Sequence, residues 1–266
     1  MARQPLGQNF LADLAWRGRI ARAVLASRES STPDGLWIEI GAGHGEMTAL
    51  LAKHAARLIA IEIDHKLLPG LRNVAGALGN VTVTAGDVLS MDLGALAAGK
   101  PYRVYGNIPY YITSPIIHHL FAGCAVPEAA FLVMQLEVAE RLSARPGCRE
   151  YGYLSAFTQF YARTEILFRI PPGAFRPRPK VESALVTLTT PGERSTLGIQ
   201  DENGFVEFLK ACFAQKRKTL KNNLRALVAP GRIEGLLGEC GVRPDARAEQ
   251  LELPQIARIF SATRTD

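Results

Sequence analysis

The sequence lacks any apolar run long enough to span a bilayer, and no apolar stretch near its start marks a secretory signal. Its four cysteines are scattered and include no Cys-x-x-Cys pair, which argues against a zinc site and predicts free thiols in a reducing compartment. We therefore expect a cytoplasmic protein with no bound metal. With 47% hydrophobic and 21% charged residues, the 266-residue chain can bury a large core, which excludes global disorder.

Acidic residues are missing from two stretches of the chain, at residues 166–181 and 208–232, although the net charge is only +6. Solvated helix faces usually mix both signs, so stretches of one sign favour contact with a polyanion. The candidate phosphate-binding residues in these stretches are Arg176, Arg178, Lys180, Lys216, Arg217, Lys218, Lys221 and Arg225.

Short apolar runs alternate with helical patterns through the first two thirds of the chain. Such alternation predicts an α/β domain with a mostly parallel sheet that is covered on both faces. Strands are expected at residues 36–40, 58–63, 81–87, 103–107, 129–135, 163–170 and 183–188, the last two as an antiparallel hairpin. After Pro191 only short helical patterns remain, which places a domain boundary near residues 191–200.

One of these helical patterns lies in the basic stretch of the C-terminal part. Within TLKNNLRALV, the residues Lys218, Lys221 and Arg225 have the spacing of one helix face. Leucines at positions 220, 224 and 227 repeat on the other side. The spacing predicts a helix that packs its leucines inward and presents its basic face to RNA phosphates.

The ends of the predicted strands carry residues suited to a nucleoside cofactor, because ligands of open parallel sheets bind outside the carboxyl ends of the strands. Gly41, Gly43 and Gly45 follow the first strand in a G-x-G-x-G pattern, which departs from the G-x-G-x-x-G of dinucleotide-binding proteins. Glu62 is placed to accept hydrogen bonds from ribose hydroxyls, and Asp87 from an adenine amine. A plain strand-to-helix turn with surface or helix-capping acids is the alternative.

The segment Asn107-Ile108-Pro109-Tyr110 after the fourth strand favours amine methylation over hydride transfer. The exocyclic amine of adenine is a poor nucleophile, because its lone pair is delocalised into the ring. An Asn107 oxygen and the Ile108 carbonyl would accept the two amino hydrogens and aim that lone pair at a methyl donor. Pro109 would hold the carbonyl outward, and Tyr110 would stack on an extruded base.

These motifs resemble the small-subunit rRNA adenine N6,N6-dimethyltransferase family. The matching segments are GQNFL (7–11), EIGAGHG, EID, GDV, NIPY with SPI, PPGAFRPRPKVESALV and KRKTLKNNL (216–224), in the family's order over nearly the whole chain. The resemblance implies a seven-stranded Rossmann-like class I methyltransferase domain at residues 1–192 and a small all-helical, rRNA-contacting domain at 193–266. It also implies S-adenosylmethionine as methyl donor, and two adjacent adenosines near the 3′ end of small-subunit rRNA as targets.

The resemblance also implies roles for single residues. Asn9 and Leu11 would line the methionine end of the cofactor, and Gly41 and Gly43 the loop beneath it. Glu62 would hold the ribose, Asp87 the adenine, and Asn107 both cofactor and target base. Phe175 would be the second stacking aromatic, so the target adenine would lie between Tyr110 and Phe175. The expected partner is rRNA in a pre-assembled small-subunit particle, bound by a monomer, with no DNA and no membrane.

Three positions depart from the family pattern. Tyr111 stands where a small polar residue is usual and is expected to alter the rim of the base pocket. Ala42 replaces a usual proline, and the first six residues carry a single charge, Arg3, where relatives often have a basic arm.

Two other functions are compatible with the same fold. One is a resistance-type adenine methyltransferase of large-subunit rRNA, whose C-terminal segment differs from KRKTLKNNL. The other is a non-catalytic RNA-binding assembly factor, which Asn107, Tyr110 and Phe175 argue against. A DNA adenine methyltransferase would more often carry D/N-P-P-Y and a target-recognition domain, and neither is present.

Overall fold

The computed structural model describes residues 7–26, 35–121, 123 and 125–264, so Arg3 and Cys124 lie outside the described residues. The chain forms two compact units, one of residues 1–139 with 165–190 and the other of residues 140–164 with 191–266. The sequence placed a single boundary at 192/193. In the structure, the boundary between the two units lies at 190/191. Residues 140–164 also belong to the unit that contains the C-terminal residues.

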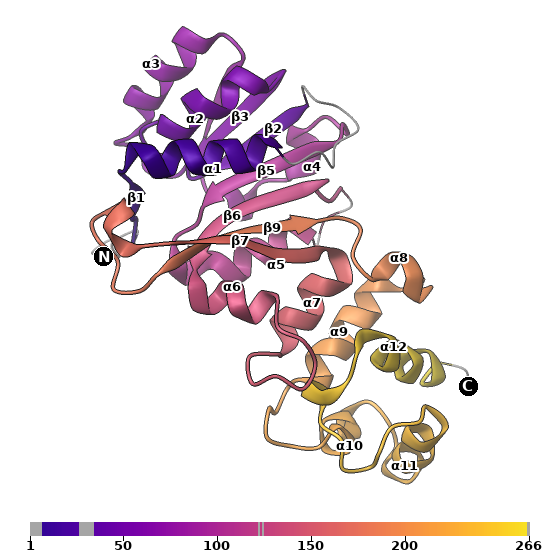
Figure 1. Ribbon diagram of the computed structural model, residues 1–266. Helices are drawn as coiled ribbons and strands as arrows, with labels where there is room; N and C mark the ends of the chain where they lie inside the picture. Colours follow the sequence, from indigo (N-terminus) through magenta and orange to yellow (C-terminus); the bar gives the residue numbers. More distant parts are fainter. Residues whose placement is uncertain (1–6, 27–34, 122, 124, 265–266) are drawn as a thin grey trace, which may run out of the picture. The chain divides into compact units, whose positions relative to one another are not determined.

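A seven-stranded sheet forms the centre of the first unit, in the order β4-β3-β2-β5-β6-β9-β7 (Figure 1). The first five of these strands pair in parallel, whereas β9 runs antiparallel to β6. This arrangement confirms the Rossmann-like fold with a mostly parallel sheet. The strands are β2 (Leu36–Ile40), β3 (Arg57–Glu62), β4 (Val81–Ala85), β5 (Tyr102–Asn107), β6 (Ala129–Gln135), β7 (Arg163–Ile170) and β9 (Ser183–Thr189).

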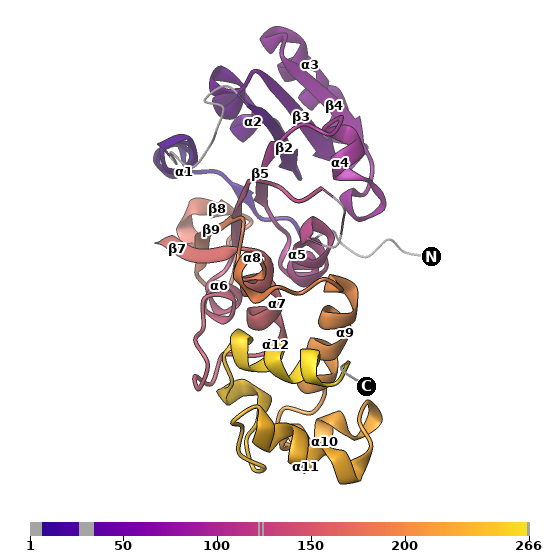
Figure 2. The same cartoon turned by 90° about the vertical axis from the view of Figure 1, so that its right-hand side faces the viewer.

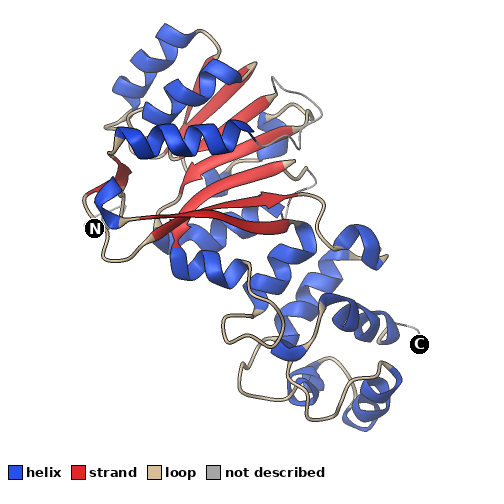
Figure 3. Ribbon diagram, viewed as in Figure 1, coloured by secondary structure: helices blue, strands red, loops and turns tan. Residues whose placement is uncertain are grey.

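Helices cover both faces of this sheet, which explains why its central strands are apolar on both sides (Figures 2 and 3). α1 (Leu14–Ala26) and α2 (Glu46–Leu51) lie on one face, and α4 (Leu93–Leu96) and α5 (Thr113–Phe121) on the other. The remaining elements are α3 (Leu68–Leu78), α6 (Leu136–Leu142) and the short 3₁₀ turns η1 (Ala52–His54), η2 (Val88–Ser90), η3 (Tyr110–Ile112) and η4 (Pro172–Ala174).

The main core lies between the sheet and α1. Ile20 and Val24 of α1 are fully buried and belong to one cluster with Trp37 of β2 and Phe131 of β6. Burial of a side chain of this size stabilises the fold by about 1.5–3 kcal/mol. This packing holds the strands whose carboxyl ends form the site.

A second, two-stranded sheet pairs the beginning of the chain with residues far along it. β1 (Phe10–Leu11) runs antiparallel to β8 (Phe175–Arg176), with Leu11 opposite Phe175. The backbone N–H groups of Ala12 and Asp13 both donate to the Ala174 carbonyl, at 2.8 and 3.1 Å. These contacts fix residues 10–13 against the segment of residues 174–176.

The second unit is a cluster of helices around an aromatic core. The Phe160 and Phe205 rings lie 4.8 Å apart, and Phe205 and Phe260 lie 5.4 Å apart. Because Phe160 belongs to α7, this packing explains why residues 140–164 group with the C-terminal helices. The elements are α7 (Tyr153–Tyr161), α8 (Arg194–Leu197), α9 (Glu202–Cys212), α10 (Leu220–Asn223), η5 (Leu224–Ala226), α11 (Pro230–Glu239), η6 (Ala248–Gln250) and α12 (Leu253–Ala262).

The predicted helix through TLKNNLRALV is wrong in its extent. The Thr219 hydroxyl accepts from the Asn222 N–H at 3.4 Å and caps α10, which starts at Leu220, two residues after Lys218. α10 ends after a single turn and is followed by the 3₁₀ turn η5, which has about three residues per turn. The basic residues and the leucines therefore no longer fall on two opposite faces of one helix. Leu227 is consequently 55% exposed instead of buried.

No helix among the described residues is long and apolar enough to cross a membrane. Nor do the described residues gather three histidines, cysteines or carboxylates into a metal-binding group.

Candidate active site

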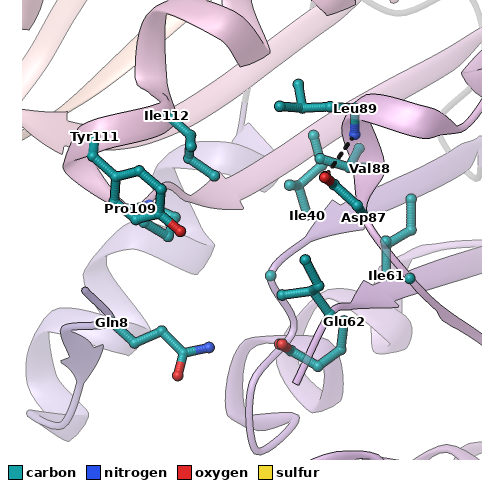
Figure 4. A pocket seen from close by; sticks show the side chains of 13 residues that line it. Gln8, Ile40, Ile61, Glu62, Asp87, Val88, Leu89, Pro109, Tyr111 and Ile112 are labelled. Atoms are coloured by element: carbon teal, nitrogen blue, oxygen red, sulfur yellow. Dashed lines mark hydrogen bonds between the residues drawn. The ribbon is translucent and has the colours of Figure 1, made fainter. Parts of the chain in front are cut away.

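The pocket at the carboxyl ends of β2, β3 and β4 brings together residues that the sequence analysis assigned to a cofactor. We call it the nucleoside pocket, and its walls include Gly41, Glu62 and Asp87 (Figure 4). Gln8, Pro109 and Tyr111 form the opposite side. Tyr111 therefore lines this pocket rather than the neighbouring one that contains Asn107, although the sequence placed it at the rim of the base pocket.

The loop after β2 depends on glycine at two positions. Gly41 and Gly43 have φ angles of +72° and +60°, a region that other residues rarely adopt. A Cβ at Gly43 would also lie 3.3 Å from the Phe10 ring. The loop therefore passes close to β1, and Gly41 lines the nucleoside pocket whereas Gly43, also expected there, lines neither pocket.

Glu62 is buried, with 1% of its surface exposed, and it fixes the glycine loop. One carboxylate oxygen, Oε2, accepts from the Gly43 N–H at 2.7 Å, and Oε1 accepts from the Asp64 N–H at 2.8 Å. Each carboxylate oxygen has a further lone pair, so the group can also accept from ribose hydroxyls. The predicted contact with ribose stays a prediction, and the tie to the loop is an addition that the sequence did not suggest.

Asp87 lies at the opposite wall from Tyr111, at the end of β4 (Figure 4). Its Oδ1 accepts from the Leu89 N–H at 3.0 Å and so caps the 3₁₀ turn η2. Asp87 therefore caps a helical turn and also lines the nucleoside pocket, so the two interpretations of this residue do not exclude each other. The capping bond orients the carboxylate and leaves Oδ2 as an acceptor.

A second, smaller pocket adjoins the first and is lined by Asn9, Asn107 and Tyr110, among others. We call it the base pocket. The Asn107 Nδ2 donates to the Asn9 carbonyl at 2.8 Å. Because a carbonyl can only accept, this bond sets the orientation of the amide and presents Oδ1 as an acceptor. Gln8, Gly41 and Pro109 line both pockets, which are therefore adjacent.

Tyr110 is held by a residue that the sequence analysis missed. Its hydroxyl forms a 2.8 Å hydrogen bond with the hydroxyl of Ser183, a fully buried residue of β9. Burial raises the pKa of Tyr110, while the Ser183 hydrogen bond lowers it less, so the phenol stays neutral at physiological pH. A serine at the start of a largely apolar strand was the only sequence signal for this partner.

Phe175 is not brought into either pocket. Its ring is 1% exposed and packs in the main core cluster together with Leu11. In this conformation the ring offers no face to a base, and it anchors β8, the strand paired with β1, in the core instead. Leu11 likewise faces the core, whereas Asn9 lines the base pocket.

Glu39 of β2 is a further buried acid near the glycine loop. Its Oε2 accepts from the Thr48 hydroxyl at 2.6 Å. Burial raises the pKa of Glu39 to about 8, and the nearby Glu46 and Glu62 add to the shift, while the Thr48 hydrogen bond opposes it. The carboxyl is therefore mostly protonated at neutral pH.

The candidate phosphate-binding residues differ in whether an acidic residue of the protein compensates their charge. In the first unit, Arg176 donates to the Phe175 carbonyl at 2.9 Å, a neutral acceptor that leaves its charge in place. In the second unit, Lys221 pairs with Glu234 of α11, so it is not the uncompensated cation that the sequence suggested. The remaining candidates, Arg178, Lys180, Lys216, Arg217, Lys218 and Arg225, are exposed.

Comparisons with known proteins place these features in one family. The family model for ribosomal RNA adenine dimethylase matches residues 1–264. A protein of Acidobacterium capsulatum named ribosomal RNA small subunit methyltransferase A is 46% identical over 257 residues, covering 96% of this chain and 89% of that protein. One of the same name from Xanthomonas campestris pv. campestris is 41% identical over 259 residues, covering 97% and 95%.

Solved structures agree with the fold. A dimethyladenosine transferase from Plasmodium falciparum superposes with a TM-score of 0.78 at 24% identity, covering 96% of this chain and 98% of that one. The 23S rRNA methyltransferase ErmE superposes with a TM-score of 0.70 at 28% identity, covering 95% and 98%.

Proposed function

The chain belongs to the ribosomal RNA adenine dimethylase family, and we propose that it methylates two adjacent adenosines near the 3′ end of small-subunit rRNA to N6,N6-dimethyladenosine. Its methyl donor is S-adenosylmethionine. The observation that carries the proposal is the Asn107 amide, whose Oδ1 is presented as an acceptor in the base pocket by the bond from Nδ2 to Asn9.

The residues of the nucleoside pocket fit the adenosyl part of this donor. Glu62 and Asp87 offer acceptors to the ribose hydroxyls and the adenine amine, and Ile40, Ile61 and Val88 supply apolar walls for the purine. Tyr111 closes the side opposite the acids, with its ring beside Gly7. When bound, the donor supplies a methyl group on a positively charged sulfur, which an amine lone pair can attack.

Asn107 and the Ile108 carbonyl position the target amine in this proposal. Their oxygens accept its two hydrogens, which favours a pyramidal nitrogen and directs the lone pair toward the nucleoside pocket. A bound donor would supply the methyl carbon for a new nitrogen–carbon bond as its own carbon–sulfur bond breaks. The methylated amine then loses its proton to water, so no side chain is needed as a base.

Tyr110 stacks on the extruded adenine, a contact worth about 1–3 kcal/mol per base. Its bond to Ser183 keeps the ring in place before the base arrives. Stacking on Phe175 would require that ring to leave the core cluster, so its proposed part in holding the base depends on movement of β8.

The exposed cations hold the RNA by its phosphates and give little sequence preference. We take the substrate to be rRNA within a pre-assembled small-subunit particle, and the enzyme to act as a cytoplasmic monomer. The names of the relatives from Acidobacterium and Xanthomonas favour the small subunit over the large one.

The proposal is tested by methyl transfer from labelled S-adenosylmethionine to purified ribosomal subunits from an unmodified strain, followed by mapping of the product base. We expect label on two adjacent adenosines of the small subunit. Label on large-subunit rRNA would indicate the resistance-type activity instead. Subunit binding without any transfer would indicate a non-catalytic assembly factor.

A further inference from the structure

The loop between α6 and α7, residues 143–152, lies against the basic segment that follows α9. We infer that this loop, named here the arginine loop, is one arm of an RNA-binding surface whose other arm is residues 215–218. The inference rests on the proposed function, because it takes RNA phosphate as the ligand. It adds Arg145 and Arg149, which lie outside both acid-free stretches of the sequence.

Three contacts within the second unit hold the arginine loop. The Lys216 ammonium donates to the Arg149 carbonyl at 2.9 Å, joining positions 67 residues apart in the chain. The buried Tyr151 ring packs edge-on against Phe213, with centroids 5.9 Å apart. The Gly147 N–H donates to the Glu249 carbonyl at 2.7 Å. Figure 1 shows the loop beside the chain that leaves α9.

The juxtaposition concentrates positive charge that the protein itself does not neutralise. The cations of the two arms are all exposed: Arg145, Arg149, Lys216, Arg217 and Lys218. Among the described residues, none of them has a carboxylate partner, and the partner of Lys216 is a neutral carbonyl. Glu150 is the one acid within these two arms.

Three other exposed cations of the same unit do have a carboxylate partner. Lys210 pairs with Glu207, and Arg243 pairs with Asp245. Arg264 likewise pairs with Asp201. The five cations of the arms differ from these three because no carboxylate pairs with them among the described residues, and the contacts of the arginine loop bring them together on one surface.

Phosphate is the ligand that this arrangement fits. Guanidinium groups bind phosphate oxygens through two parallel hydrogen bonds, and charge of one sign matches the backbone of a nucleic acid. Because the loop is already anchored at Gly147, Arg149 and Tyr151, little ordering is needed when RNA binds. We assign the surface to the rRNA backbone, where it positions the substrate without reading its bases.

The test replaces Arg145 and Arg149 by glutamine in the full-length protein and measures binding to unmodified small subunits at several salt concentrations. The slope of log affinity against log salt should fall by about 0.7 for each phosphate that the variant no longer binds. Affinity for S-adenosylhomocysteine should not change. The matched control replaces Arg243 and Arg264, which are exposed in the same unit but pair with Asp245 and Asp201, and it should keep the parental slope.

Cys148 provides a second readout that needs no substitution. This exposed free thiol lies between the two loop arginines. Alkylation of Cys148, followed by mass spectrometry, should slow when small subunits are added and should not slow with S-adenosylhomocysteine alone.

A parental salt slope for the double variant, or unprotected Cys148 in subunit complexes, would overturn the inference while leaving the proposed function intact. If the parental protein itself binds no small subunits, the proposed function fails together with it.

Discussion

Among single residues, Asn107 determines which chemical mechanism the base pocket supports. Its Nδ2 donates to the Asn9 carbonyl, and a carboxylate at this position would face that carbonyl with a second acceptor. Asn107→Asp should therefore slow methyl transfer by about 10²-fold or more, because the amine loses an oriented acceptor. Single-turnover rates on small subunits measure this. A rate equal to or above the parental one would instead indicate that position 107 acts as a general base.

Glu39 gives a prediction about stability rather than activity. Its pKa is raised from 4.5 to about 8, mainly by burial, so the folded state binds a proton that the unfolded state releases above pH 4.5. Stability is therefore highest below pH 4.5 on this account and falls as the pH rises toward 8. Glu39→Gln keeps an acceptor for Thr48 and removes the titration.

The variant should be more stable than the parent by an amount that grows from pH 4.5 to 8 and reaches the order of a few kcal/mol. Denaturant unfolding at several pH values measures the difference. An identical pH dependence in the two proteins would show that Glu39 is ionised in the folded state.

At the scale of elements, Glu62 links β3 to the glycine loop as well as lining the nucleoside pocket. Glu62→Ala removes the acceptors for Gly43 and Asp64 together with those proposed for ribose. Cofactor affinity measured by calorimetry should fall by roughly 1.5–3 kcal/mol, and thermal stability should fall too. Asp87→Asn serves as a comparison, because it keeps the cap on η2 while changing one wall of the same pocket. Parental affinity in a folded Glu62→Ala protein would remove Glu62 from the site.

The elements that sequence could predict are those with a local signal. Runs such as residues 36–40 and 129–135 are apolar at all but one position each. The strands β2 and β6 appear at these positions because a sheet covered on both faces requires apolar strands. The glycines at 41 and 43 similarly mark a turn that needs positive φ. Residues at the strand ends then meet at one edge whatever the packing details.

The elements that sequence missed depend on contacts between distant residues. β1 and β8 have two residues each, too few for a periodic pattern, and their pairing buries Phe175 where the motif suggested a base-stacking ring. In α10, the spacing of basic residues was read as one continuous helix, but the Thr219 cap and the following 3₁₀ turn decide where the helix starts and ends. Glu234, which pairs with Lys221, lies beyond the acid-free stretch, so the charge pattern of that stretch did not predict the ion pair.

At the scale of the whole molecule, the division into two units separates the cofactor pockets from the basic segment of residues 216–225. Variants in that segment should therefore change RNA binding without changing cofactor affinity. This expectation differs between individual cations, because Lys221 already pairs with Glu234 whereas Arg217, Lys218 and Arg225 have no acidic partner among the described residues.

Replacing Arg217, Lys218 and Arg225 with glutamine should weaken small-subunit binding and lower its salt slope by up to about 2 log units, at roughly 0.7 for each phosphate that is no longer bound. Lys221→Gln alone should lower the slope by much less, since its charge is shared with an acid that would remain. Both proteins should bind S-adenosylhomocysteine like the parent, which also shows that the cofactor-binding unit folds. If Lys221→Gln reduces the slope as much as removing another single cation does, the Glu234 pair must open on RNA binding. If the triple variant keeps the parental slope, this segment is only solvated surface and the RNA is held elsewhere.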